Sequence, residues 1–211
     1  MTHFKTEQES FWAWDFWEDY IARNDGDKFL ANQVAFWSQV LRKAWKISSI
    51  IEFGSNVWVN LKALGLLLPE VELSAVEINN TACKVIEHWS RGKVKVYNES
   101  ILDFRLDQTR EFAFTKWVLI HINPDNLNEV YDSLYASSSR YICVAEYYNP
   151  TPAEMSYRWN TGKLFKRDFC GEIMNRFPDL RLLDYGFVYR SDPTFPQDDV
   201  TWFLLEKKNS A

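Results

Sequence analysis

Cysteine is scarce in this sequence, and its few residues are scattered. The three cysteines, Cys83, Cys143 and Cys170, lie too far apart along the chain for a disulfide framework or a metal knuckle. We therefore expect no bound metal, and a reducing cytoplasmic location is the simplest prediction.

An excess of positive charge and a long apolar run are also absent. The chain has 24 Lys and Arg against 29 Asp and Glu, a net charge of -5, so it offers no basic face for phosphate backbones and we expect no nucleic-acid partner. Its longest apolar run, residues 64–69, contains Gly65 and is far shorter than the roughly 20 residues of a membrane span. Residues 1–10 are polar without an apolar centre, so we expect no signal peptide and no membrane association.

What the sequence does contain is an alternation of short apolar runs with segments of helical spacing. The apolar runs predict strands over 48–53, 73–78, 93–97, 112–120, 141–147, 180–188 and 201–206. Helices are predicted within 7–45, over 57–68 and 80–90, from Pro124 onward, and over 171–177. This order predicts an α/β fold, a Rossmann-like sheet of seven mostly parallel strands that ends in an antiparallel pair.

The whole chain, 1–211, is predicted to be one domain. Residues 1–46 form its N-terminal helical cap, and 47–211 form the Rossmann-like core, with a polar insertion near 149–169. The sequence predicts no particular oligomeric state.

The first strand ends in a turn that suits a ligand. Glu52 and Phe53 precede Gly54, and Ser55 and Asn56 lead into a helix. Ligands of open α/β sheets bind at the carboxyl ends of strands, so Glu52 and the turn amides could hold the charged amino-acid end of a cofactor. The alternative is an ordinary strand-to-helix turn.

A second acidic residue strengthens this hypothesis. Glu77 ends the next strand, 23 residues after Gly54, and a carboxylate at this spacing accepts hydrogen bonds from a ribose hydroxyl pair. The alternative is a solvated Glu at a strand end. Together the two signals favour a nucleoside-containing cofactor, which could be a nicotinamide dinucleotide or S-adenosylmethionine. A dinucleotide site has its second turn glycine at the position of Asn56, so Asn56 argues against the nicotinamide cofactor.

Two later segments complete the predicted site. After the third strand, Ser100 and Ile101 could meet the adenine, although this segment could also be a plain surface loop. The segment from Thr115 through Lys116 to His121 leads from the fourth strand into a helix. His121 is a candidate general base because its ordinary pKa is near 6.5, and its alternative role is to brace that helix. Lys116 is the second catalytic candidate.

The substrate side is predicted from residues that follow the fifth strand. The stretch 157–169 contains Arg158, Lys163, Lys166 and Arg167, and Tyr147 at the end of the strand is a further candidate contact. The four positive charges in an acidic protein favour an anionic substrate, and the alternative is a solvated charged loop.

Long motifs across nearly the whole chain carry a resemblance to a known family. They are FWAWDFWEDYIARN (11–24), SSIIEFGSNVWVNLKAL (48–64), VEIN (76–79), FTKWVLIHINPDNL (114–127), YYNPTP (147–152), GKLFKRDF (162–169) and the stretch from 180 to 207. With these motifs the chain resembles the pseudaminic acid biosynthesis-associated methylases, which are class I S-adenosylmethionine-dependent methyltransferases.

The resemblance implies S-adenosylmethionine as the cofactor and a small sugar-related or surface-glycan metabolite as the substrate. Gly54, Ser55 and Asn56 would then hold the methionine moiety, Glu77 the ribose, and Ser100 with Ile101 the adenine. The remaining predicted cofactor contacts are Tyr20, Arg23, Glu52, Phe53, Asn60, Ile78 and Thr115, and the predicted substrate contacts are Tyr147, Arg158, Lys163 and Arg167.

Glycine is rare and tryptophan common, with 7 and 10 residues, and their positions depart from the family pattern in one direction. Tryptophan stands where the resemblance leads us to expect glycine at Trp14, Trp17, Trp45, Trp58, Trp117 and Trp159. One hypothesis covers all six: the gene uses UGA as a glycine codon, and the sequence has been translated with UGA as tryptophan.

Genuine tryptophans would favour another function, that of a non-catalytic protein on the same fold whose cofactor site is obstructed by Trp58 and Trp117. A nicotinamide-dependent oxidoreductase is a further alternative, and Asn56 and Trp58 argue against it.

Overall fold

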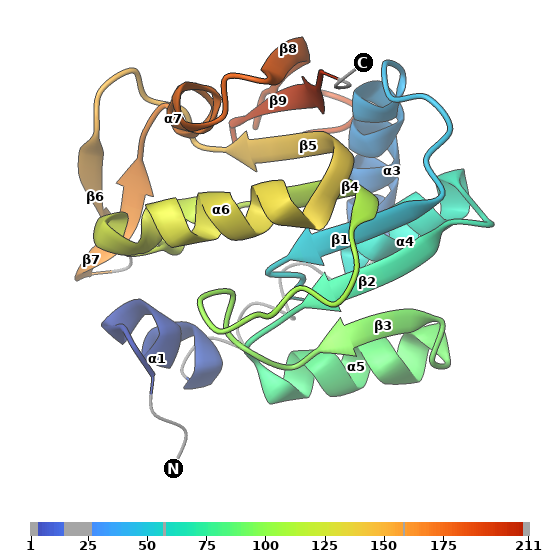
Figure 1. Cartoon of the computed structure of the whole chain (residues 1–211), viewed down its shortest axis with the longest axis horizontal. Coiled ribbons are helices and arrows are strands. Elements are labelled where there is room, and N and C mark those ends of the chain that lie inside the picture. Colours follow the sequence, from blue (N-terminus) through green and yellow to red (C-terminus); the bar gives the residue numbers. More distant parts are fainter. Residues whose placement is uncertain (1–3, 15–26, 57, 158, 209–211) are drawn as a thin grey trace.

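The computed structural model describes residues 4–14, 27–56, 58–157 and 159–208. Seven strands form one sheet in the order β3-β2-β1-β4-β5-β9-β8 (Figure 1). Their bounds are β1 (Ser49–Phe53), β2 (Glu72–Val76), β3 (Val94–Tyr97), β4 (Arg110–Lys116), β5 (Ser138–Glu146), β8 (Leu180–Val188) and β9 (Val200–Lys207). Strands β1 to β5 run parallel, and β9 lies antiparallel between β5 and β8. The predicted α/β fold, a Rossmann-like and mostly parallel seven-stranded sheet, is confirmed.

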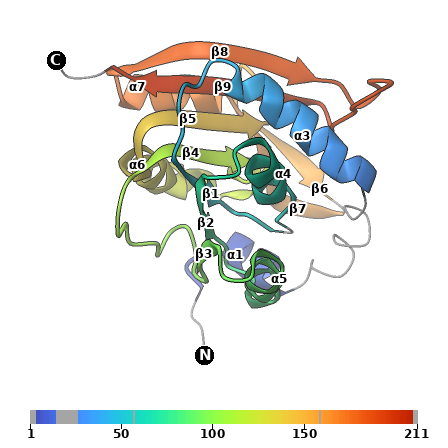
Figure 2. The same cartoon turned by 90° about the vertical axis from the view of Figure 1, so that its right-hand side faces the viewer.

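Helices cover both faces of this sheet (Figure 2). On one side lie α3 (Asp27–Leu41), α4 (Val59–Leu67) and α5 (Asn80–Ser90), and on the other α6 (Leu127–Ser137) and α7 (Phe169–Arg176). In β1, Ile50 packs with the first group and the next residue, Ile51, with the second. Because both faces are buried, the central strands are continuously apolar rather than alternating.

The fourth strand is shorter than predicted. We expected a strand over 112–120, but β4 ends at Lys116, and a 3-10 turn, η1 (Leu119–His121), follows. Trp117 has a φ of 57°, which turns the chain out of the strand. A second 3-10 turn, η2 (Pro124–Asn126), begins at the proline as predicted and continues into α6.

The predicted polar insertion is a hairpin. Strands β6 (Ala153–Tyr157) and β7 (Asn160–Lys166) pair antiparallel as a separate two-stranded sheet. The segment that was predicted to be an N-terminal helical cap contains α1 (Glu7–Trp14) and α3, and residues 15–26 lie outside the described ranges. Helix α1 reaches the hairpin, where the Gln8 side chain donates to the Gly162 carbonyl at 2.8 Å.

Neither a membrane-spanning helix nor a metal-binding cluster occurs among the residues that the structure describes. Among them, no helix is both long and apolar enough to cross a membrane. No cluster of three or more His, Cys, Asp or Glu side chains in these ranges could hold a metal ion. The three cysteines are buried and unpaired.

Candidate functional site

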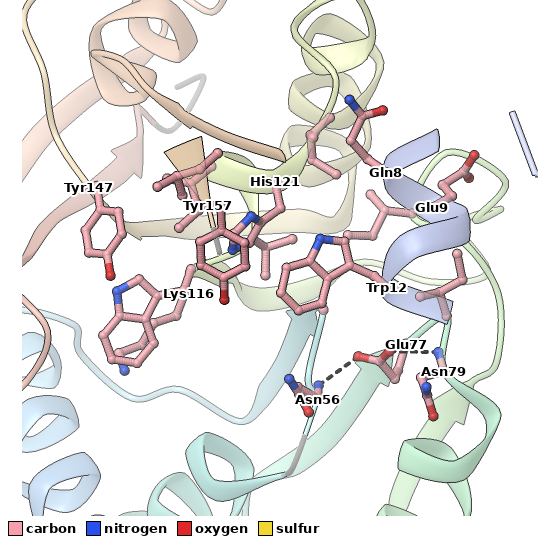
Figure 3. Close-up of a pocket in the computed structure, with 18 of the residues that line it drawn as sticks. Gln8, Glu9, Trp12, Asn56, Glu77, Asn79, Lys116, His121, Tyr147 and Tyr157 are labelled. Carbon is pink, nitrogen blue, oxygen red and sulfur yellow. Dashed lines mark hydrogen bonds between the residues drawn. The ribbon is translucent and has the colours of Figure 1, made fainter. Parts of the chain in front are cut away.

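A cavity of about 630 Å³ opens at the carboxyl ends of the parallel strands (Figure 3). Its volume falls within the range of roughly 300–1,000 Å³ that is typical of small-molecule sites. Its walls come from the strand ends and the segments that follow them, from helices α1 and α3, from the β6-β7 hairpin and from the loop between β8 and β9. Among the residues that line the cavity are Gln8, Glu9, Trp12, Phe29, Gly54, Asn56, Glu77, Ile78, Asn79, Ser100, Ile101, Leu102, Lys116, Trp117, Val118, His121, Tyr147, Tyr157, Arg190, Gln197 and Asp198.

The turn after β1 requires its glycine. Gly54 has a φ of +76°, and a Cβ atom there would lie 2.6 Å from Cγ2 of Val118. Its amide donates to the Val76 carbonyl at 2.8 Å, which ties the turn to the end of β2. The absence of a side chain therefore lets the segment after β4 approach the turn.

Glu77 lies directly beside this turn. One carboxylate oxygen accepts from the amide of Asn56 at 2.7 Å, and the other accepts from the amide of Asn79 at 2.8 Å (Figure 3). Burial raises the pKa of Glu77, and the amide hydrogen bonds oppose that rise. Within the described ranges Glu77 forms no ion pair. Because each carboxylate oxygen carries two lone pairs, both oxygens keep capacity for a ligand's hydroxyl groups.

The predicted adenine region also lines the cavity. Ile78, Ile101 and Leu102 provide an apolar surface beside Glu77. The Ser100 hydroxyl donates to the carboxylate of Glu9 from α1 and accepts from the Leu102 amide at 3.1 Å. Ser100 thus anchors α1 at this edge, and its hydroxyl is already engaged.

Several predicted cofactor residues do not line the cavity. Glu52, Phe53, Ser55 and Thr115 are buried behind it, and Glu52 accepts from the side chain of Asn60 at 2.7 Å. Burial raises the pKa of Glu52 to about 8. Glu52 and Asn60 therefore support the turn from inside rather than facing the cavity. The predicted residues Tyr20 and Arg23 lie outside the described residues.

Lys116 reaches the cavity from the last position of β4. It is 5% exposed, and its ammonium group donates to Gln33 at 2.9 Å and lies 3.6 Å from the ring centre of Trp117. Burial lowers the pKa of Lys116 to about 7. A partly neutral amine at the end of a strand is able to exchange a proton near neutral pH.

Glu146, which the sequence did not single out, holds the segment that follows Lys116. Its buried carboxylate accepts from the amides of Val118 and Leu119 at 3.1 Å and of Ile120 at 3.4 Å. Burial raises the pKa of Glu146 to about 7. The sequence does show an acidic residue at the end of the fifth strand, which could have marked Glu146 as a candidate. Its contacts depend on the turn over residues 117–120, however, and that segment was predicted to be strand.

His121 is held in one tautomer. Its Nδ1 lies 2.7 Å from the carbonyl oxygen of Lys163, and because a carbonyl oxygen only accepts, Nδ1 carries the proton. Burial lowers the pKa of His121 to about 4, so the ring is neutral at pH 7 and its Nε2 offers a lone pair. The ring packs 4.4 Å from Trp12 and 5.2 Å from Tyr157, measured between ring centres (Figure 3).

Of the predicted substrate contacts that the structure describes, one lines the cavity. Tyr147 does so, and its hydroxyl donates to Asp198. Lys163 pairs with Glu7 at 3.4 Å and Arg167 with Glu172 at 2.8 Å, so both cations are engaged away from the cavity. Arg158 lies outside the described residues.

Other lining residues were missed from the sequence. Gln8, Glu9 and Trp12 come from α1, and Arg190, Gln197 and Asp198 from the loop between β8 and β9. The sequence pattern indicates a helix for the first segment and a polar loop for the second. It does not indicate that the two meet at the strand ends, because their contacts join residues far apart in sequence.

Comparison with known proteins rests on structure. No protein-family model matches the chain, and no curated protein matches it by sequence. Magnesium protoporphyrin IX methyltransferase from Synechocystis PCC 6803, solved with bound SAM, is similar with a TM-score of 0.70 and 8% identity, over 98% of this chain and 100% of that one.

Two further solved structures are similar. The N-methyltransferase NodS from Bradyrhizobium japonicum WM9, solved with S-adenosylhomocysteine, has a TM-score of 0.64 and 10% identity, over 95% of this chain and 97% of that one. The 1,6-didemethyltoxoflavin-N1-methyltransferase from Burkholderia thailandensis, solved with 1,6-didemethyltoxoflavin and S-adenosylhomocysteine, has a TM-score of 0.66 and 10% identity, over 99% of this chain and 93% of that one. The chain therefore has the Rossmann-like fold of the class I S-adenosylmethionine-dependent methyltransferases.

Proposed function

We propose that this chain is an S-adenosylmethionine-dependent methyltransferase that acts on a small-molecule acceptor. The observation that carries the proposal is the Glu77 carboxylate, which lines a cavity at the strand ends and is joined to the glycine turn through the Asn56 amide. The similar solved structures hold SAM or S-adenosylhomocysteine in the same fold, which supports this cofactor over a nicotinamide.

The described residues fit such a cofactor. Glu77 offers acceptors for the ribose hydroxyls, and Ile78 and Ile101 offer apolar contact for the adenine. The side-chain oxygen of Asn56 is buried without a hydrogen-bond partner, and a buried orphan acceptor costs free energy unless a ligand donor meets it. An amino group of the methionine moiety would supply that donor. When bound, the cofactor would supply a sulfonium methyl group that is already activated for displacement.

The chain's own residues would then orient the acceptor and accept its proton. Trp12, Tyr147 and Tyr157 present rings to the cavity, which limit the orientations of an acceptor and exclude water. Lys116, with its pKa lowered to about 7, suits proton transfer near neutral pH better than His121 with a pKa of about 4. We propose Lys116 as the main proton acceptor and His121 as a hydrogen-bond acceptor through Nε2.

A small anionic sugar derivative is the acceptor that we propose. The ring faces of Trp12, Tyr147 and Tyr157 suit the apolar face of a sugar, and Arg190 brings positive charge to the same cavity. The resemblance to methylases linked to pseudaminic acid supports the same class of acceptor. A cytoplasmic location belongs to the proposal, and the three unpaired cysteines support it.

A non-catalytic protein on this fold is the second candidate. Trp117 lines the cavity beside Lys116, where its ring would compete with the methionine end of a cofactor. Trp58 was also expected to obstruct the site, but it does not line the cavity; it stacks on Trp89 with ring centres 5.4 Å apart. The obstruction hypothesis therefore depends on Trp117.

Calorimetric titration with S-adenosylhomocysteine tests the function. The unchanged chain and Trp117→Gly are compared, with Trp58→Gly as the matched change away from the cavity. We expect Trp117→Gly to bind S-adenosylhomocysteine at least about tenfold more tightly than the unchanged chain, a gain of about 1.4 kcal/mol. Equal affinity of the unchanged chain and Trp117→Gly would support the cofactor assignment and show that Trp117 does not obstruct the site. No binding by any of the three, with all of them folded, would contradict the proposal and favour the non-catalytic candidate.

A further inference from the structure

Three tryptophans have a backbone conformation that favours glycine. Trp58, Trp117 and Trp159 have φ angles of 64°, 57° and 69°. These values lie in the same left-handed region as those of Gly54, Gly92 and Gly162, which range from 68° to 76°. In this left-handed region the Cβ atom of an L-residue crowds its own backbone, and a bulky side chain there is a genuine outlier.

The three positions lie in unrelated parts of the fold. Trp58 precedes α4, Trp117 follows β4, and Trp159 lies in the β6-β7 hairpin. Since Tyr157 pairs with Asn160, Trp159 lies in the tight connection between the two strands of the hairpin. A position of positive φ in such a connection is where glycine is preferred. No common packing environment explains three tryptophans in these places.

The side chains bring little that offsets the strained backbone. Trp159 is fully exposed, at 101%. Trp117 gains one ring contact, with the Lys116 ammonium 3.6 Å from its ring centre, while its buried indole nitrogen, like that of Trp202, has no hydrogen-bond partner among the described residues. Trp58 makes no side-chain capping hydrogen bond to α4, although its ring stacks on Trp89 and lies under the Lys62 ammonium at 4.8 Å.

Other tryptophans fit their surroundings closely. Trp37 is fully buried and its indole donates to Asn60 at 3.1 Å. Trp202 is 1% exposed, and it lies against Gly186, where an added Cβ atom would come within 2.7 Å of its indole nitrogen. Neither residue has a positive φ. Trp37 and Trp202 are therefore buried core residues with an ordinary backbone conformation, whereas Trp58, Trp117 and Trp159 have a conformation that favours glycine.

We infer that residues 58, 117 and 159 are glycine in the protein as its own cells make it, and that tryptophan stands there through reading the codon UGA as tryptophan. One change of codon meaning accounts for all three positions and for the shortage of glycine beside the surplus of tryptophan. It also removes the indole of Trp117 from the cavity. The inference does not depend on the proposed function, because its evidence is backbone conformation and packing.

The coding triplets and the native protein give the direct test. We expect UGA at positions 58, 117 and 159 and UGG at the matched positions 37 and 202. Peptide mass spectrometry of the protein from its source cells should then read glycine at the first three positions and tryptophan at the other two. UGG codons at 58, 117 and 159, or tryptophan in the peptides at these positions, would overturn the inference.

A stability measurement tests the backbone argument by itself. Trp159→Gly and Trp159→Ala are compared by denaturant unfolding, because this exposed position tolerates both changes. Glycine should exceed alanine in the folding equilibrium constant by roughly 5- to 30-fold, the usual cost of a Cβ atom in this conformation. The matched pair is Trp45→Gly and Trp45→Ala, since Trp45 is also exposed and has no positive φ, and there alanine should equal or exceed glycine. Alanine equal to or better than glycine at position 159 would refute the left-handed conformation on which the inference rests.

Discussion

The backbone amide of Asn56 donates to the carboxylate of Glu77 over 2.7 Å. This single hydrogen bond joins the turn after β1 to the end of β2, so the two sequence signals that were 23 residues apart form one edge of the cavity. Its counterpart from Asn79, at 2.8 Å, fixes the other carboxylate oxygen. The carboxylate is therefore oriented before any ligand arrives, which reduces the entropy lost on binding.

Removing the charge of Glu77 should weaken cofactor binding. In Glu77→Gln one backbone amide would face an NH2 group, and the ribose hydroxyls would lose a charged acceptor. We expect at least about a tenfold loss of affinity for S-adenosylhomocysteine, because hydrogen bonds to charged groups contribute about 1.5–3 kcal/mol. Calorimetry provides the measurement, in the Trp117→Gly background if the unchanged chain binds weakly.

Glu72→Gln is the matched control for that change. Glu72 lies at the other end of the same strand and is exposed, so its variant should bind with unchanged affinity. Equal affinities for the two variants would remove Glu77 from the site.

Gly54 and Gly92 separate steric crowding from backbone strain. The two have nearly the same φ, +76° and +75°, but a Cβ atom at Gly54 would lie 2.6 Å from Val118, whereas at Gly92 it would meet nothing within 4 Å. Gly92→Ala should therefore cost about 1 kcal/mol of unfolding free energy, the strain alone. Gly54→Ala should cost about 2–4 kcal/mol, since crowding adds to the strain. Urea unfolding measures both, and equal losses would show that Val118 does not press on the turn.

The charge state of Glu52 should make stability fall as pH rises. Burial raises the pKa of Glu52 from 4.5 to about 8, so between pH 4.5 and 8 the folded protein binds more protons there than the unfolded chain, and the free energy of unfolding decreases with pH. Glu52→Gln mimics the neutral acid and removes this term. The variant should equal the unchanged chain near pH 5 and exceed it at pH 8 by on the order of 3 kcal/mol. Denaturant unfolding curves at the two pH values measure this difference in unfolding free energy. A Glu52→Gln variant that is less stable than the unchanged chain at pH 8 would contradict a buried Glu52 with a raised pKa.

His121 and Lys116 should titrate far from their ordinary ranges. Burial lowers the pKa of His121 to about 4 and that of Lys116 to about 7. For His121, whose folded pKa lies below its unfolded value, stability is complete above pH 6.5 and is lost as pH falls toward 4. Nitrogen NMR of labelled histidine should show a neutral ring with the proton on Nδ1 at pH 6, and carbon NMR of labelled lysine should give one signal that titrates near pH 7. A His121 ring that is protonated on both nitrogens at pH 6, or a set of lysine signals that all titrate near 10.5, would contradict the buried positions of His121 and Lys116.

Much of the fold follows from local pattern, since apolar runs and turn residues are local properties. Strands such as β1 and β5 were predicted because they are buried on nearly their whole length and appear in the sequence as apolar segments. The end of β4 was wrong because Trp117, a residue typical of strands, occupies a left-handed turn.

The walls of the candidate site were harder to predict, because long-range contacts decide them. Lys163 and Arg167 looked like free cations in the sequence, but Glu7 and Glu172 neutralise them. Trp12 enters the cavity because α1 docks on the hairpin and on the segment after β3. No periodicity in the sequence encodes that docking.

The most direct test of the central claim is a crystal structure of the Trp117→Gly protein with S-adenosylhomocysteine. We expect both ribose hydroxyls on the Glu77 carboxylate, the adenine against Ile78 and Ile101, and the sulfur beside Lys116. A ligand bound elsewhere, or one in this cavity whose ribose does not touch Glu77, would contradict it.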